Sequence, residues 1–188
     1  MSWIRRAATS VKAPEVAISI SLNKQAFVCG EPVTGTLQIA SSETFDAKGI
    51  CIELQAIETI QPLTMSHQAP RESEPPKEAF ATQLYKTRVS VCGSLKITSG
   101  YRKEFPFSVR IPPSAPPTYR GRNANNTWIL RGLISVSGRR DAEGKTEVLV
   151  TPSVFCWICL KPIAQDEQFT FFENSICHVA CLRKMKEQ

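Results

Sequence analysis

The residues best suited to chemistry form two pairs near the C-terminal end of the chain. Cys156 and Cys159 are separated by two residues, and His178 and Cys181, also separated by two, follow after a further 18 residues. Each pair can direct two ligand atoms at one ion, and thiolate and imidazole are ligands that Zn²⁺ prefers. The spacing therefore predicts one structural Zn²⁺ bound by Cys156, Cys159, His178 and Cys181, with no coordination position left for a catalytic water.

Alternatives to this ligand set come from a neighbouring thiol and from redox chemistry. Cys177 and Cys181 are four residues apart, so both could lie on one face of a helix and complete a four-cysteine site without His178. Cys156 and Cys159 could instead form a redox pair, but no βαβ pattern surrounds them and a second pair follows at metal-ligand spacing. A metal site is therefore the favoured interpretation, with Cys177 as an alternative ligand.

The spacing of the four residues also suggests how the site is built. The pattern C-x2-C-x18-H-x2-C is similar to the first half of a LIM finger, and this resemblance favours His178 over Cys177 as a ligand. We expect Phe169 to Phe172 to form part of a hairpin between the pairs. His178 and Cys181 would then share one face of a short helix that ends near Met185. Such a module would have the organisation of a treble clef.

The length and composition of the chain are typical of one globular domain with a small appendage. The 188 residues are 42% hydrophobic and 21% charged, which argues against global disorder. The cysteines outside the cluster (Cys29, Cys51 and Cys92) lie singly in strand-like segments, as expected of free thiols in a reducing compartment. No run approaches the ~20 apolar residues of a membrane-spanning helix, and the N-terminus lacks a signal-peptide core. We therefore expect a soluble, cytoplasmic protein.

The sequence divides into three parts, residues 1–13, 14–152 and 153–188. The first is a basic, amphipathic tail in which Trp3 and Ile4 stand beside two arginines. This tail could contact an anionic membrane, with the ring at the interface, or it could fray or pack against the rest of the chain. The third part is the zinc module, whose charges cancel. The net charge of +6 therefore comes from the residues that precede the zinc module. This excess of positive charge is modest evidence for an acidic partner.

The middle part has a hydrophobic period of two. Ile18, Ile20 and Leu22 alternate with serines, as expected of a half-buried strand. The same alternation recurs in residues 33–39, 50–55, 84–97, 105–111, 128–136 and up to Val150. Two segments interrupt this alternation, a proline-rich loop at 61–79 and a basic polar loop at 118–126. We assign no role to His67, which lies in the first of these loops. Short strands joined by turns predict an all-β fold, an immunoglobulin-like antiparallel β-sandwich.

The order of these segments resembles that of the arrestin fold family. Val28 to Gly35 (VCGEPVTG) is similar to a motif near the start of the family's sandwich, and Lys48 to Leu54 is similar to its following strand. The later segments with this likeness are Phe105 to Pro112, Pro116 to Tyr119 and Trp128 to Arg131. The resemblance covers about residues 14–152, the length of one lobe, whereas arrestins and the retromer subunit of this fold have two. It implies a non-catalytic adaptor or scaffold in membrane trafficking, signalling or, among prokaryotic relatives, sporulation control.

Three functions follow as hypotheses. The first is an adaptor that binds protein partners, such as small GTPases or trafficking components, through loops and the zinc finger. The second is a nucleic-acid-binding protein that uses the finger and the basic loops carrying Arg120, Arg122, Arg139 and Arg140. It is the weaker hypothesis, because a finger that is neutral by count lacks the clustered positive charge that phosphate binding requires. The third, an enzyme, is disfavoured because the sequence has no nucleophile elbow, His-rich site or phosphate-binding glycine loop.

Overall fold

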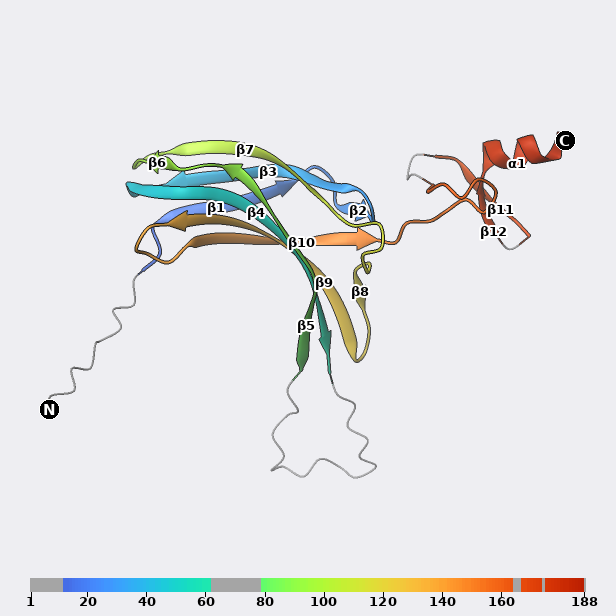
Figure 1. Ribbon diagram of the computed structural model, residues 1–188, viewed down its shortest axis with the longest axis horizontal. Coiled ribbons are helices and arrows are strands. Elements are labelled where there is room, and N and C mark those ends of the chain that lie inside the picture. Colours follow the sequence, from blue (N-terminus) through green and yellow to red (C-terminus); the bar gives the residue numbers. More distant parts are fainter. Residues whose placement is uncertain (1–11, 62–78, 164–166, 174, 188) are drawn as a thin grey trace, which may run out of the picture.

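The protein is a β-sandwich followed by a small module at its C-terminal end (Figure 1). The structure, a computed structural model, describes residues 12–61, 79–163, 167–173 and 175–187. The predictions for the tail at Trp3 and for the loop containing His67 concern segments that lie outside these residues. Among the described residues, no helix has the length and apolarity needed to cross a bilayer.

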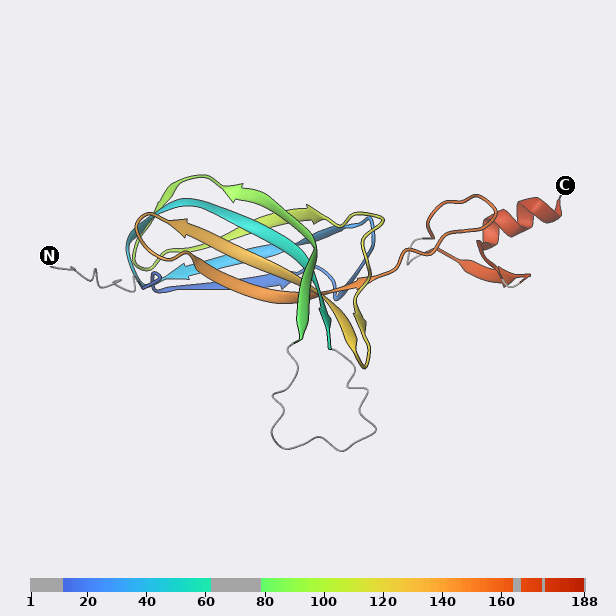
Figure 2. The same ribbon diagram turned by 60° about the horizontal axis from the view of Figure 1, so that its bottom comes forward.

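Two sheets form the sandwich, as the alternating sequence pattern predicts (Figure 2). The three-stranded sheet has the order β1 (Val16–Leu22), β3 (Pro32–Ser41), β7 (Arg102–Arg110). The larger sheet has the order β2 (Ala26–Val28), β10 (Ala142–Thr151), β9 (Ala124–Val136), β4 (Phe45–Ile60), β5 (Phe80–Cys92). Two short strands, β6 (Leu95–Ile97) and β8 (Tyr119–Arg120), pair with β4 and β9. The prediction of an all-β sandwich is confirmed.

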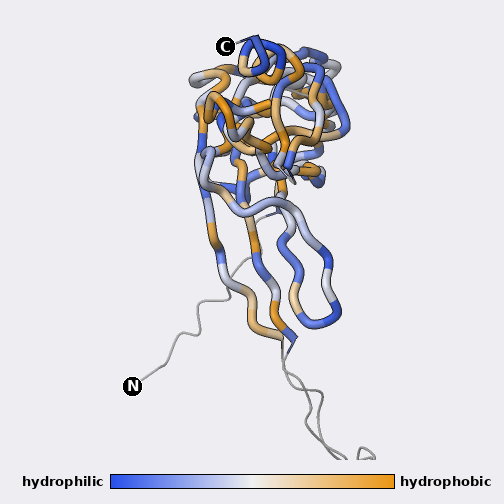
Figure 3. The backbone as a smooth tube through the Cα atoms, turned by 90° about the vertical axis from the view of Figure 1, so that its right-hand side faces the viewer, coloured by the Kyte–Doolittle hydropathy of each residue, from blue (hydrophilic) through white to orange (hydrophobic). Residues whose placement is uncertain are grey.

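The core lies between the sheets and is built from the inward half of each alternating strand. Along the strands, hydrophobic and hydrophilic residues alternate (Figure 3), so that one side chain in two can be buried. Trp128 is fully buried, and its indole nitrogen donates a hydrogen bond to the carbonyl of Pro116, 2.9 Å away. Phe27, Leu37 and Ile52 are also fully buried in the same cluster.

One glycine of the family-like motif allows the strands to approach closely. A Cβ atom on Gly35 of β3 would lie 2.2 Å from the carbonyl oxygen of Ser21 and 2.8 Å from the ring of Phe107. The first distance is to backbone of the paired strand β1, so the clash could not be relieved by turning a side chain. Glycine at this position is therefore required by the distance between strands and not by an unusual backbone angle.

Two features of the sheets differ from the sequence predictions. The segment 118–126, predicted to be a loop, contains β8 and the start of β9. It is held there because the buried Asn126 side chain donates hydrogen bonds to the carbonyls of Pro116 and Pro117, at 3.1 and 2.8 Å. The sheets are also not antiparallel throughout, since β2 runs parallel to β10. This pairing anchors the end of the sandwich, where the Cys29 amide donates to the carbonyl of Thr151.

A buried carboxylate ties together three strands on the outer face of the larger sheet. Among the described residues, Glu53 is the only buried charged side chain, and it lies opposite Arg88 on β5 and Arg131 on β9. Its carboxylate accepts hydrogen bonds from Arg88 at 2.7 and 3.1 Å. The Lys86 ammonium lies at 3.1 Å and the Arg131 guanidinium at 3.4 Å. Burial alone would raise the pKa of Glu53, but the hydrogen bonds from Arg88 and Lys86 outweigh it and lower the pKa below its ordinary value.

This cluster predicts a pH-dependent part of the stability of the sandwich. Because the folded-state pKa of Glu53 is lowered, its contribution is present above the ordinary carboxyl pKa of 4.5 and is lost as the pH falls below it. Glu53→Gln should therefore lower the free energy of unfolding at neutral pH by about 2 kcal/mol. The free energy of unfolding of this variant should also fall less steeply than that of wild type as the pH is lowered into the acidic range. Urea unfolding followed by circular dichroism between neutral and acidic pH measures both effects.

Glu147 provides the control for this prediction. Its carboxylate pairs with Arg120, but both side chains are mostly exposed, so Glu147→Gln should change the unfolding free energy by less than about 1 kcal/mol. Equal losses in the two variants would show that the burial of Glu53 has no energetic consequence.

Candidate metal centre

The first cysteine pair lies in a tight turn that follows the sandwich directly. After β10, residues 152–154 lead to Phe155, which forms an isolated bridge with Pro162. Inside the turn the Cys156 amide donates to the carbonyl of Lys161, and the Leu160 amide donates to the carbonyl of Cys156. Leu160 adopts a positive φ of 57° to close the turn. This knuckle presents the thiols of Cys156 and Cys159 to the same side of the module.

The second pair lies where a hairpin meets a helix. Strand β11 (Phe169–Phe172) pairs with β12 (Ser175–His178), as predicted, and α1 (Val179–Lys186) follows. The helix was expected to carry both His178 and Cys181, and this expectation is wrong for His178. The ladder to Phe169 holds the backbone of His178 extended, so it occupies the N-cap position, and only Cys181 lies within the helix.

These elements bring four ligand atoms together. One nitrogen of His178 and the sulfur atoms of Cys156, Cys159 and Cys181 all lie within 4.8 Å of one another. His178 Nδ1 is 3.5 Å from Cys159 Sγ and 3.7 Å from Cys181 Sγ. Ligands about 2.0 to 2.3 Å from a tetrahedral Zn²⁺ are themselves about 3.5 Å apart. The geometry and the soft donor set therefore suit a metal ion such as Zn²⁺.

Cys177 lies outside this group. It is buried, and its thiol faces the carbonyl of Thr170 at 3.7 Å. Cys177 and His178 are consecutive residues of β12, so their side chains leave opposite faces of the strand. We therefore propose Cys156, Cys159, His178 and Cys181, and not Cys177, as the ligands of one ion.

Backbone groups prepare the first cysteine for a metal. The Cys156 side chain is fully buried, which disfavours its thiolate. Hydrogen bonds from the backbone amides of Cys159, His178 and Ile158 and from the Cys159 side chain outweigh this burial and lower the pKa of Cys156 to about 6. The thiolate is the form of cysteine that binds metals, so the fold favours the ligating form at Cys156, whereas burial and the neighbouring thiols raise the pKa of Cys181 to about 11.

The histidine has a partner that the sequence analysis missed. The Glu167 carboxylate lies 3.0 Å from His178 Nε2, while Nδ1 faces the cysteines. A carboxylate on the remote nitrogen of a ligating histidine fixes the ring and its tautomer. Glu167 lies 11 residues before His178, at the approach to the hairpin, and no motif marks it.

The four arginines of the nucleic-acid hypothesis do not gather on one surface. Arg120 and Arg122 precede β9, whereas Arg139 and Arg140 follow it, and a strand of 13 residues spans about 40 Å. Arg120 pairs with Glu147, and Arg139 pairs with Glu43. The two pairs of arginines therefore lie at opposite ends of β9 and do not form a continuous basic surface.

The sandwich matches known proteins, although a comparison with curated proteins finds no match to the chain. Residues 16–155 match the family model described as the N-terminal domain of arrestin (or S-antigen). The crystal structure of the sporulation control protein Spo0M from Bacillus subtilis is similar, with a TM-score of 0.53 and 20% sequence identity. The match covers 72% of this chain and 49% of that one, so the chain spans about half the length of that protein. At this identity the likeness concerns the fold alone.

Proposed function

The chain belongs to the arrestin family, and we propose that it is a non-catalytic adaptor that binds protein partners through its sandwich and its C-terminal zinc finger. The observation that carries the proposal is that the match to the arrestin N-terminal domain extends over residues 16–155, nearly the whole sandwich. A non-enzymatic, adaptor-like role is the general property of this family.

The chemistry of the metal centre agrees with this role. Three thiolates and one imidazole would fill the four positions around a tetrahedral ion, and such closed sites stabilise folds and do not activate water. In the sandwich, the buried polar side chains of the described residues are Ser41, Glu53, Gln55 and Asn126. Glu53 is ion-paired and Asn126 donates to backbone carbonyls, so these two side chains have structural partners.

Finer parts of the proposal rest on the family and on the sequence. We assign the sandwich to residues 14–152 and the finger to 153–188, since β10 ends at Thr151 and the knuckle begins with the bridge at Phe155. The partners that we propose are small GTPases or trafficking components in the cytoplasm. Peripheral contact with an anionic membrane through the N-terminal tail would assist this role.

Affinity purification from nuclease-treated lysate tests the proposal. The wild-type chain should recover a reproducible set of proteins, including GTPases, coat components or membrane proteins. The double variant Cys156→Ser, Cys159→Ser should lose those partners that the finger binds and keep those bound by the sandwich. Recovery that disappears entirely after nuclease treatment would refute the adaptor and favour the nucleic-acid alternative.

A further inference from the structure

A cavity opens at the metal centre, between the knuckle and the helix, and three of the four proposed ligands, Cys159, His178 and Cys181, are among its lining residues. Its volume, which includes the space beside the ligand atoms, is about 720 Å³, within the range of sites that bind small ligands. Three segments line it, namely the knuckle with Ile158, Cys159 and Lys161, the approach to β11 with Glu167 and Gln168, and α1 with the residue before it. Two of these segments carry the proposed metal ligands, so the ion would hold the walls in place.

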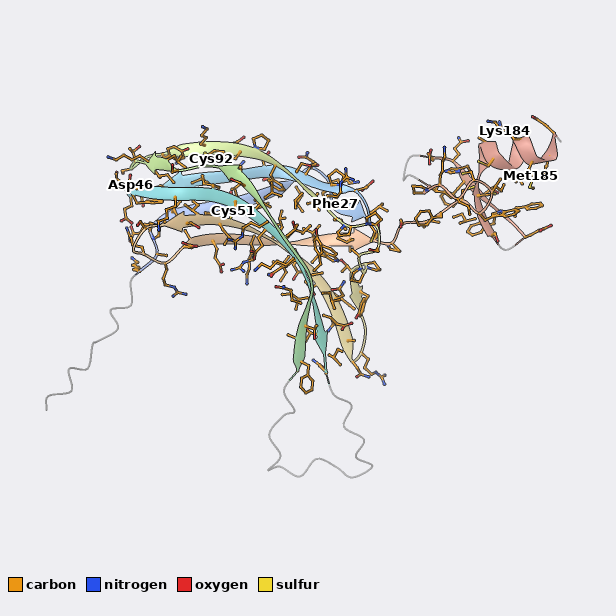
Figure 4. All side chains as sticks on the ribbon, in the orientation of Figure 1. Phe27, Asp46, Cys51, Cys92, Lys184 and Met185 are labelled. Atoms are coloured by element: carbon orange, nitrogen blue, oxygen red, sulfur yellow. The ribbon has the colours of Figure 1, made fainter. Side chains whose placement is uncertain are left out.

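Three cations line this cavity, although the module as a whole is neutral by residue count. Lys161, Arg183 and Lys184 line it and are exposed. Among the described residues, no acidic side chain lies within ion-pair distance of any of the three, in contrast to Lys86, Arg88 and Arg131 on the sandwich. The acidic lining residue Glu167 already contacts His178. Figure 4 labels Lys184 on α1, together with Met185, at the end of the molecule remote from the start of the sandwich.

The remaining lining residues give the cavity an apolar component. Ile158 and Val179 are half-buried beside the ligand residues, and Met185 is half-buried in the last turn of α1. A methionine adapts its shape to different apolar groups. The cavity thus offers contacts for an apolar side chain together with three cations.

We propose that this cavity, formed by the knuckle and α1, binds an acidic peptide segment of a partner protein, with an apolar side chain anchored between its carboxylates. The inference deepens the proposed adaptor function and rests on it. Charge complementarity selects an acidic ligand and excludes like-charged ones. A concave site suits a peptide better than a bilayer, which takes up the exposed apolar face of an amphipathic helix. Nucleic acid would need a longer track of cations than these three.

Selection from random peptides displayed on phage tests the proposal with the zinc-loaded full chain. Peptides enriched on the wild-type chain should be rich in Asp and Glu and contain a large apolar residue. A fluorescein-labelled copy of the most enriched peptide then serves as the probe for anisotropy titrations. The variant K161E/R183E/K184E should bind it at least about tenfold more weakly, and salt should weaken wild-type binding.

The sandwich supplies a matched control. K48E/K96E/K145E reverses three exposed charges there and changes the net charge by the same amount, so it should bind the probe within about twofold of wild type. Zinc analysis should find one ion per chain in both variants. The neutralised form K161Q/R183Q/K184Q replaces the reversed one if that variant loses zinc.

Other outcomes would overturn the inference. These are enrichment without acidic residues, equal affinity of the pocket and control variants, or no enrichment at all. If the pocket variant still recovers the wild-type partners from lysate while no acidic peptide binds, the adaptor function stands and only the peptide site falls.

Discussion

Replacing Cys156 with serine is expected to release the metal and unfold the C-terminal module while the sandwich stays folded. Cys156 is buried at the centre of the knuckle, and three backbone amides point at its sulfur. Structural zinc supplies about 10 to 16 kcal/mol of apparent binding free energy in zinc-finger peptides, most of which such a small module needs in order to fold. Zinc content should fall from one per chain to none. Amide resonances of residues 155–187 should collapse to unfolded positions, with those of 16–151 retained.

Cys177 provides the matched control for this experiment. Cys177→Ala removes a buried thiol that lies outside the ligand group, so the chain should keep one zinc and lose only packing energy, about 1 kcal/mol. Zinc retained by Cys156→Ser, or lost by Cys177→Ala, would show that the ligand set is wrong. His178→Ala should behave like Cys156→Ser and not like Cys177→Ala.

Gly35→Ala is expected to destabilise the sandwich by about 3 kcal/mol, a large effect for adding one methyl group. The new Cβ would lie 2.2 Å from the carbonyl oxygen of Ser21 and would force β1 away from β3. The melting temperature of the sandwich should fall by about 10 °C, as measured by circular dichroism or calorimetry.

Gly93→Ala is the corresponding control. A Cβ there meets nothing within 4 Å, and the backbone of Gly93 is outside the left-handed region. Its melting temperature should match that of wild type or rise slightly, since alanine restricts the unfolded chain more than glycine does. If Gly35→Ala were equally harmless, the two strands would have to be further apart than the structure places them.

Local patterns in the sequence predicted the elements of this fold, but not the contacts between distant ones. The alternation at Ile18, Ile20 and Leu22 identifies a strand because it depends only on which face of the strand each side chain occupies. It cannot report which strands pair, so the parallel pairing of β2 with β10 was missed. The polar run ending at Asn126 read as a loop because its hydrogen bonds go to prolines about ten residues away, which no local pattern records.

The metal centre shows the same limit. Cysteine spacing predicted that these four residues lie close together because two intervening residues fix the geometry of a knuckle, and the structure brings all four together. That they bind a metal stays a prediction. The contact of Glu167 with His178 depends on how the hairpin folds, so spacing gave no sign of it. Counting charges also misled, since a sum of zero over the module concealed three cations on one cavity.

The short connection after β10 limits how the two halves of the molecule can share a partner. Thr151 is paired with β2 in the sheet, and only residues 152–154 separate it from the bridge at Phe155. The four Cα–Cα steps from Thr151 to Phe155 span about 14 Å at most, so the finger stays close to the end of the sandwich. A partner that engages both must present its two binding elements close together, and in return the second contact forms at a high effective concentration. Two individually weak contacts would then give strong avidity for one partner geometry and little for others.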